Sequence, residues 1–146
     1  MRYFVLATDY DGTLATDGHV NDATLDALKR LRTSGRRLVL VTGRELDDLQ
    51  REFPHLDLFD YAVVENGAVI YCPATRTVKL LGEAPPEGFV QALRAKNVDP
   101  LSAGKVIVAT WHPNEDKVLE TIRELGLELQ VIFNKGAAPG VAKRYQ

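Results

Sequence analysis

Three short apolar segments, each followed by polar residues, constrain the fold of this 146-residue chain most strongly. They are residues 4–8 (Phe-Val-Leu-Ala-Thr), 37–41 (Arg-Leu-Val-Leu-Val) and 61–64 (Tyr-Ala-Val-Val). Continuous apolar runs of this kind are typical of strands that are buried on both faces of a parallel sheet. Residues 22–33 and 46–53, which lie between them, predict helices. We therefore expect a β-α-β-α-β unit with parallel strands and right-handed connections.

The pattern changes after residue 67. Residues 68–71 and 77–81 predict a hairpin, and Gly82 opens a Pro-containing linker. Beyond the linker we expect helix, strand, helix and strand at residues 87–96, 105–110, 114–125 and 128–133, and no clear element in the tail at 136–146. The chain is thus expected to divide into an α/β core at 1–81 and a second, small α/β layer with a tail at 82–146.

Composition excludes several classes of protein. Eighteen Lys and Arg residues against twenty Asp and Glu give a net charge of −2, which provides no electrostatic basis for binding nucleic acid. No apolar run reaches the roughly 18 residues that a membrane span needs, and the start of the chain does not match a secretory signal. Cys72 is the only cysteine, so no internal disulfide can form. The expected compartment is the cytoplasm.

Polar residues follow each predicted strand of the first half. They are Asp9 and Asp11 after the first strand, Thr42, Gly43 and Arg44 after the second, and Glu65, Asn66 and Gly67 after the third. The carboxyl ends of parallel strands meet at one edge of a sheet, where ligands of open α/β folds bind. We therefore expect these three clusters to converge on one site.

The two aspartates carry the most specific chemistry. A carboxylate after a buried strand can bind a hard cation such as Mg²⁺, or it can attack an electrophile and form a covalent intermediate. Asp11, on the following turn, can act as general acid and then as general base. A calcium-binding loop is excluded, because Leu14 and Val20 stand where such a loop needs Gly and Glu. A polar turn without catalytic function remains the alternative for the pair alone.

The second cluster is suited to an anion. The Thr42 hydroxyl and the Gly43 amide can hold a phosphoryl oxygen, and the following helix adds its positive N-terminal end. Arg44 can pair either with an anionic group of the substrate or with a local carboxylate. Alone, a Thr-Gly turn is more often structural.

Together, Asp-x-Asp-Gly-Thr-Leu at 9–14, Thr-Gly-Arg at 42–44 and Glu-Asn-Gly at 65–67 resemble the haloacid dehalogenase superfamily. More narrowly, they resemble its Cof-type branch, which includes sugar-phosphate and phosphoglycolate phosphatases. The resemblance implies a Rossmann-like core with a small α/β cap. It implies that Asp9 is the nucleophile and a metal ligand, and that Asp11 is the acid/base and gives its main-chain oxygen to Mg²⁺. Thr42 and Gly43 would bind phosphate, and Arg44 and Asn66 would bind substrate.

Two further motifs of the family are expected after the cap. One is a lysine beside the phosphate, for which Lys143 is the first candidate and Lys135 the second. The other is an acidic cluster that completes the Mg²⁺ shell, and no such cluster follows Glu128. The chain thus resembles a shortened member of the family. Without the strands that would lie beside residues 4–8, these residues form an open apolar edge, and we expect self-association through it.

These observations predict an Mg²⁺-dependent phosphohydrolase acting on a small phosphorylated metabolite. The first alternative is a domain of the same family that binds phosphate or a partner without turnover. The second is a receiver-like domain in which an aspartate accepts a phosphoryl group for signalling. Trp111 and His112 can face a substrate, although packing and turn roles are the simpler interpretation.

Overall fold

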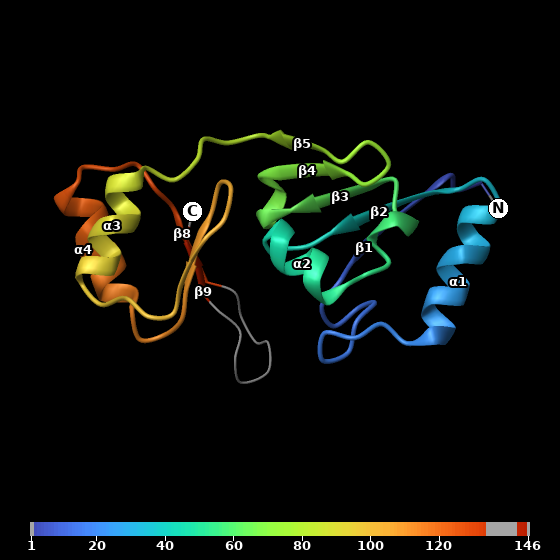
Figure 1. Cartoon of the computed structure of the whole chain (residues 1–146), viewed down its shortest axis with the longest axis horizontal. Helices are drawn as coiled ribbons and strands as arrows, with labels where there is room; N and C mark the ends of the chain where they lie inside the picture. The colour runs from blue at the N-terminus through green and yellow to red at the C-terminus, as the bar shows by residue number, and fades with distance from the viewer. Residues whose placement is uncertain (1, 134–142, 146) are drawn as a thin grey trace. The chain divides into compact units, whose positions relative to one another are not determined.

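The computed structural model describes residues 2–133 and 143–145 and divides into two compact units, Met1–Gly82 and Glu83–Gln146 (Figure 1). The first unit holds one five-stranded sheet with the strand order β1-β2-β3-β4-β5. Its strands are β1 (Val5–Asp9), β2 (Arg37–Val41), β3 (Tyr61–Val64), β4 (Val69–Cys72) and β5 (Thr77–Leu80). Its helices are α1 (Asp22–Thr33), α2 (Leu46–Glu52) and the short 3-10 turns η1 (Leu56–Leu58) and η2 (Glu65–Gly67).

Strand pairing confirms the α/β fold class. β1, β2 and β3 are parallel, whereas β4 and β5 form an antiparallel hairpin that extends the sheet from β3. The two parallel connections contain α1 and α2, as the alternation of apolar strands and helices predicted. The first unit therefore has the Rossmann-like arrangement in which the loops after β1, β2 and β3 leave the sheet at the same edge.

Local signals in the sequence fix the ends of α1. The side chain of Asn21 accepts a hydrogen bond of 2.8 Å from the Thr24 N–H, which satisfies one of the free amides of the first turn. Leu25 and Leu28 are the buried residues of α1 and lie on its inner face. Gly35, with φ of 86°, follows the last turn in the left-handed conformation that favours glycine.

The core of the first unit combines alternating residues of the central strands with aromatic side chains. The largest fully buried side chains in the described part of this unit are Tyr10, Phe59, Leu38, Leu40, Leu49, Glu65, Val64 and Val69. Phe53 joins two of these aromatic residues, with its ring centroid 5.4 Å from that of Tyr10 and 6.1 Å from that of Phe59. Burial of these side chains is the main source of stability for the sheet.

β1 differs from its prediction. The interpretation of residues 4–8 as buried on both faces is wrong: Phe4 is 78% exposed, Val5 55% and Leu6 38%. The physical reason is that β1 is an edge strand, paired with β2 alone among the described residues. The expectation of an open apolar edge is confirmed by the same strand order, while self-association through it stays a prediction.

The second unit has an antiparallel sheet with the order β6-β7-β9-β8. Its elements are α3 (Glu87–Ala95), β6 (Leu101–Ala103), β7 (Val108–Thr110), α4 (Glu115–Glu124), β8 (Val131–Ile132) and β9 (Lys143–Tyr145). Its core is formed by Phe89, Val90, Leu93, Val98, Val108 and Val118. Both helices contribute to this core, so they pack against the sheet through β7.

Two predictions for the second half are corrected. The single strand expected at 105–110 is shorter, and β6 precedes it as its antiparallel partner. The tail, expected to lack elements, contributes β9, which pairs with both β7 and β8. Residues 136–142 of that tail, and the second lysine candidate, Lys135, lie outside the described residues. No helix within the described ranges is long and apolar enough to cross a membrane.

Candidate active site

Asp9 is the last residue of β1 and has an exposed side chain. Its Oδ1 accepts a hydrogen bond of 2.8 Å from the N–H of Tyr10, the next residue. No hydrogen bond or ion pair to Oδ2 is found among the described residues. One carboxylate oxygen is thus held by the main chain, and no described residue engages the other.

The turn between the two aspartates is anchored by Tyr10. This side chain is fully buried, and its hydroxyl donates a hydrogen bond of 2.8 Å to the carbonyl oxygen of Gly18. The carbonyl of Tyr10 accepts hydrogen bonds from the amides of residues 13, 14 and 15. Gly12 has φ of 76°, a backbone conformation in which a residue with a side chain would be strained. Sequence reasoning missed this anchor, because a tyrosine between two aspartates fits a polar turn equally well.

Arg44 contacts the second aspartate directly. Its Nε donates to Oδ2 of Asp11 and its Nη2 to Oδ1, both at 2.8 Å, while Nη1 donates to Oδ2 of Asp48 at 2.9 Å. The guanidinium also lies over the ring of Tyr10, 5.4 Å from its centroid. The hydrogen bonds to Asp11 raise the pKa of Arg44 above its ordinary range, against the opposing effect of burial, so the side chain stays charged.

Of the two partners that the sequence left open for Arg44, the structure contains the local carboxylate. Its side chain is only 20% exposed, and each of its three nitrogens is engaged with Asp11 or Asp48. Binding of substrate by Arg44 stays a prediction.

Thr42 lies directly after β2 and is 4% exposed. Its amide donates to the carbonyl of Val63 at 2.9 Å, and its hydroxyl oxygen accepts a hydrogen bond of 3.1 Å from the N–H of Arg44. A hydroxyl that already accepts keeps its proton for a further acceptor. Half-buried Gly43 links Thr42 to Arg44. Thr42 therefore keeps a hydroxyl donor at the end of β2, and the binding of phosphate by Thr42 and Gly43 stays a prediction.

The turn after β3 has an unusual backbone. Glu65, Asn66 and Gly67 have φ of 51°, 57° and 94°, so three consecutive residues adopt the left-handed region. Side chains in this region are energetically costly, and such strain is often found at functional sites. The amide of Glu65 donates a hydrogen bond of 2.9 Å to the carbonyl of Arg44, and the Asn66 side chain is exposed. The turn is thus tied to the loop that carries Thr42.

Three candidate residues from the sequence, Lys143, Trp111 and His112, belong to the second unit. Lys143 is the first residue of β9, opposite Thr110 of β7, and its role beside a phosphate stays a prediction. Trp111 is 39% exposed. His112 Nδ1 lies 2.5 Å from Oε1 of Glu115, on the helix that follows. This local pair accounts for His112 without a substrate.

Oxygen donors for a metal ion lie in the turn after β1. No group of three or more His, Cys, Asp or Glu side chains that could hold a metal is found in the described part of the chain. The donors that remain are Oδ2 of Asp9 and the main-chain oxygen of Asp11, neither of which accepts a hydrogen bond from the described residues. Both are hard oxygen donors of the type that Mg²⁺ prefers, so their chemistry fits this ion.

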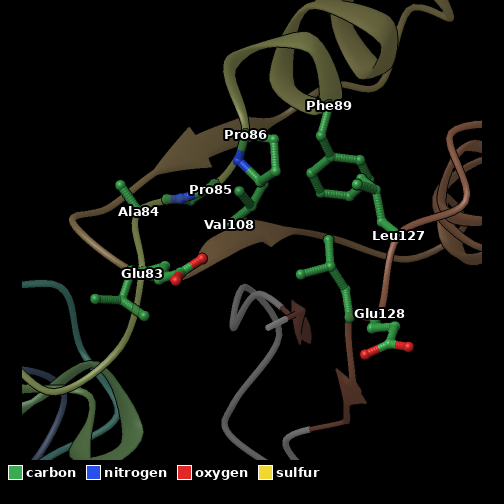
Figure 2. A pocket seen from close by; sticks show the side chains of 10 residues that line it. Glu83, Ala84, Pro85, Pro86, Phe89, Val108, Leu127 and Glu128 are labelled. Atoms are coloured by element: carbon green, nitrogen blue, oxygen red, sulfur yellow. The ribbon is translucent and has the colours of Figure 1, made fainter.

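The second unit contains a pocket of about 330 Å³ (Figure 2). Its lining consists of Glu83, Ala84, Pro85, Pro86, Phe89, Val106, Val108, Leu127, Glu128 and Leu129. Among the described residues this lining includes two carboxylates and no basic side chain, so its charge opposes the binding of a phosphate group. Phosphate chemistry is therefore better matched by the loops after β1 and β2.

Known proteins share these features. The sequence model of the family described as haloacid dehalogenase-like hydrolase matches residues 6–80, just over half of the chain. YxeH of Bacillus subtilis (strain 168), a protein named as a phosphatase, is 38% identical over 80 residues, which cover 52% of this chain and 30% of YxeH. The pyridoxal phosphate phosphatase YbhA of Escherichia coli (strain K12) is 34% identical over 91 residues, which cover 62% of this chain and 32% of YbhA.

A crystal structure from Thermoplasma acidophilum shares the fold at 13% identity, with a TM-score of 0.68, and the match covers 99% of this chain and 64% of that one. The chain spans about a third of the length of the curated phosphatases that it matches. The family match includes β1 with Asp9, the loop with Thr42 and the turn at 65–67. With these three parts of the site inside the matched region, the chain belongs to the haloacid dehalogenase-like hydrolase family.

Proposed function

We propose that this chain hydrolyses phosphate monoesters of small metabolites through a phosphorylated aspartate at position 9. The observation that carries the proposal is the hydrogen-bonded connection of Asp11, Thr42 and the 65–67 turn, through Arg44, at the strand edge where Asp9 ends β1. A nucleophile, an acid/base and a phosphoryl-binding hydroxyl are the groups that this reaction needs. The names of YxeH and YbhA support the same reaction class.

In the first proposed step, Oδ2 of Asp9 attacks phosphorus, and the bond from phosphorus to the ester oxygen breaks. Asp11 donates a proton to the departing oxygen, and the Thr42 hydroxyl donates a hydrogen bond to a phosphoryl oxygen. In the second step, Asp11 takes a proton from water, the water oxygen bonds to phosphorus, and the bond to Asp9 breaks. The products are an alcohol and inorganic phosphate, and Asp9 returns to its starting state.

The proposed cofactor is Mg²⁺, because phosphatases of this family are generally metal-dependent. The Asp9 carboxylate and the Asp11 main-chain oxygen would hold it. A divalent ion there would neutralise part of the charge on the phosphate and on the attacking carboxylate. Lys143 is proposed to add a positive charge, and residues 82–146 are proposed as the cap that selects the substrate. The proposed compartment is the cytoplasm, where phosphorylated metabolites are found.

The test is hydrolysis of p-nitrophenyl phosphate by the 146-residue chain, with and without Mg²⁺. Asp9→Asn removes the proposed nucleophile while keeping the shape of the side chain, so turnover should fall by at least about 10³-fold. Asp47→Asn is the matched control, since Asp47 is an exposed acid of α2 outside the site. Equal activity of Asp9→Asn and the unaltered chain would refute the proposal.

The same assay separates the two alternatives. Stable labelling of Asp9 by a small phosphodonor without release of phosphate would favour the hypothesis of a receiver-like domain. Binding of inorganic phosphate without labelling or turnover would favour a domain that binds and does not catalyse.

A further inference from the structure

Arg44 joins all three loops of the candidate site. Its N–H donates to the Thr42 hydroxyl after β2, and its carbonyl accepts a hydrogen bond from the Glu65 amide after β3. Its side chain donates two hydrogen bonds to the carboxylate of Asp11 after β1. The main-chain contacts fix where Arg44 lies relative to Thr42, and the side chain transmits that position to Asp11. One residue therefore links the proposed phosphoryl-binding hydroxyl to the proposed acid/base.

The geometry of the guanidinium makes this control specific. A planar fork that donates from Nε and Nη2 to the two oxygens of one carboxylate fixes its orientation as well as its distance. The third nitrogen, Nη1, is held by Asp48 of α2, and the guanidinium carbon lies over the ring of fully buried Tyr10, 5.4 Å from its centroid. A lysine at this position would keep the charge but lose the two-point contact.

We infer that Arg44 is a positioning residue: it orients the Asp11 carboxylate for proton transfer, and binding of the substrate is not its main role. The inference rests on the proposed function for its catalytic consequence, while the contact itself can be tested independently. Three of the nitrogen donors are already committed to carboxylates of this chain. Asp11 still has lone pairs that Arg44 does not use, since an ionised carboxylate offers about four acceptor sites.

The consequence is different for the two chemical steps. Nitrophenolate is a stable leaving group, so phosphorylation of Asp9 by p-nitrophenyl phosphate needs little help from an acid. Hydrolysis of the phosphorylated aspartate needs Asp11 to take a proton from water. Loss of the correct orientation of Asp11 should therefore slow the second step far more than the first.

The kinetic test compares the unaltered chain with Arg44→Lys by rapid mixing with p-nitrophenyl phosphate. We expect a burst of nitrophenolate approaching one equivalent per chain, followed by steady-state release at least about tenfold slower than that of the unaltered chain. KM should not rise. The Arg44→Lys change should lower the rate of the first step less with p-nitrophenyl phosphate than with an alkyl phosphate. A raised KM without a burst would assign Arg44 to substrate binding and overturn the inference, and so would equal slowing of both steps.

A second measurement does not depend on turnover. Urea unfolding of Arg44→Gln, Asp11→Asn and the double variant should be non-additive, with the double variant losing less stability than the sum of the single losses. Arg51→Gln combined with Asp11→Asn is the control, because Arg51 is 72% exposed and its one ion pair among the described residues is with Asp48, at 3.5 Å. Additive losses for Arg44 and Asp11 would overturn the inference. If the unaltered chain releases no nitrophenolate, the proposed function fails. The comparison of the single and double variants still tests whether Arg44 and Asp11 interact.

Discussion

Arg44 holds both carboxylate oxygens of Asp11 at 2.8 Å, although 33 residues separate the two in the sequence. Asp11 is 45% exposed, so water screens the pair and its contribution to stability is modest, about 1 kcal/mol or less. Its effect on geometry is larger, because a two-point contact removes the rotational freedom of the carboxylate. The pair is therefore better understood as a device for orientation than as a source of stability.

The Thr42 hydroxyl should be required for phosphate binding. Replacing Thr42 with Val preserves the branched shape at this buried position but removes both the donor for a phosphoryl oxygen and the acceptor for the Arg44 N–H. We expect kcat/KM for p-nitrophenyl phosphate to fall by about 10²-fold, since one lost donor to transition-state charge costs roughly 2.7–4 kcal/mol. Thr42→Ser keeps the hydroxyl and is the control. If Thr42→Val and Thr42→Ser have equal kcat/KM, the hydroxyl has no role in the reaction.

Asp60 should make stability depend on pH. Its carboxylate accepts hydrogen bonds of 2.9 Å from the Leu38 N–H and from Arg37, and the first of these is the main cause that lowers the pKa of Asp60. A carboxyl group with a lowered pKa in the folded state stabilises the fold at pH values above its unfolded pKa of about 3.9. That contribution is lost as the pH falls through the folded pKa.

Asp60→Asn keeps an acceptor but removes the charge, so its free energy of unfolding at pH 7 should be about 1 kcal/mol lower. The gap to the unaltered chain should begin to narrow as the pH falls below about 4 and should close as the pH passes the lowered pKa of folded Asp60, where the unaltered side chain becomes neutral as well. Urea unfolding at pH 7, 5 and 3 measures this gap. Asp57→Asn, at an exposed neighbouring position, is the control. A gap that is the same at all three pH values would contradict the assignment.

The sequence predicted the elements whose signals are local. α1 has its capping Asn21, its buried leucines and its terminal Gly35 within one continuous stretch, and its bounds follow from them. The convergence of Asp11, Thr42 and the 65–67 turn followed from parallel topology alone. All of these features depend on spacing along the chain.

Other features depend on what a residue meets in three dimensions. The pattern of residues 4–8 is that of a central strand, but their burial is set by neighbours, and β2 is the only strand paired with β1 in the described part. The choice of Arg44 between substrate and carboxylate is decided by the path of a loop 33 residues away. β9 has three residues, too few for a periodic signal, and pairing with β7 and β8 defines it.

The cap of α1 offers a prediction on stability alone. Asn21→Ala leaves the Thr24 N–H without its side-chain acceptor, which should lower the free energy of unfolding by about 1 kcal/mol. Asn21→Asp keeps the acceptor and should cost little, since a negative charge at a helix N-terminus is also favourable. Thermal unfolding of the three proteins under the same conditions compares them. Equal losses for Ala and Asp would mean that the hydrogen bond contributes nothing to stability.

The open edge of β1 should bind a second copy of the chain. Residues 3–7 form a continuous run of exposed residues. A strand edge with free amides and carbonyls pairs readily with another strand. We expect the sedimentation coefficient to rise with concentration. Phe4→Lys, at a position 78% exposed, should weaken association at least about tenfold without unfolding the chain, because a charge on an edge opposes pairing.

Leu119→Lys is the matched control for this edge. It places the same charge on an exposed position of α4 in the second unit, so it changes net charge in the same way and also removes an exposed apolar side chain. Association that is weakened by Phe4→Lys and not by Leu119→Lys assigns the contact to β1. A chain that sediments as a single monomer at every concentration would show that pairing through this edge does not overcome the entropy lost when two copies associate.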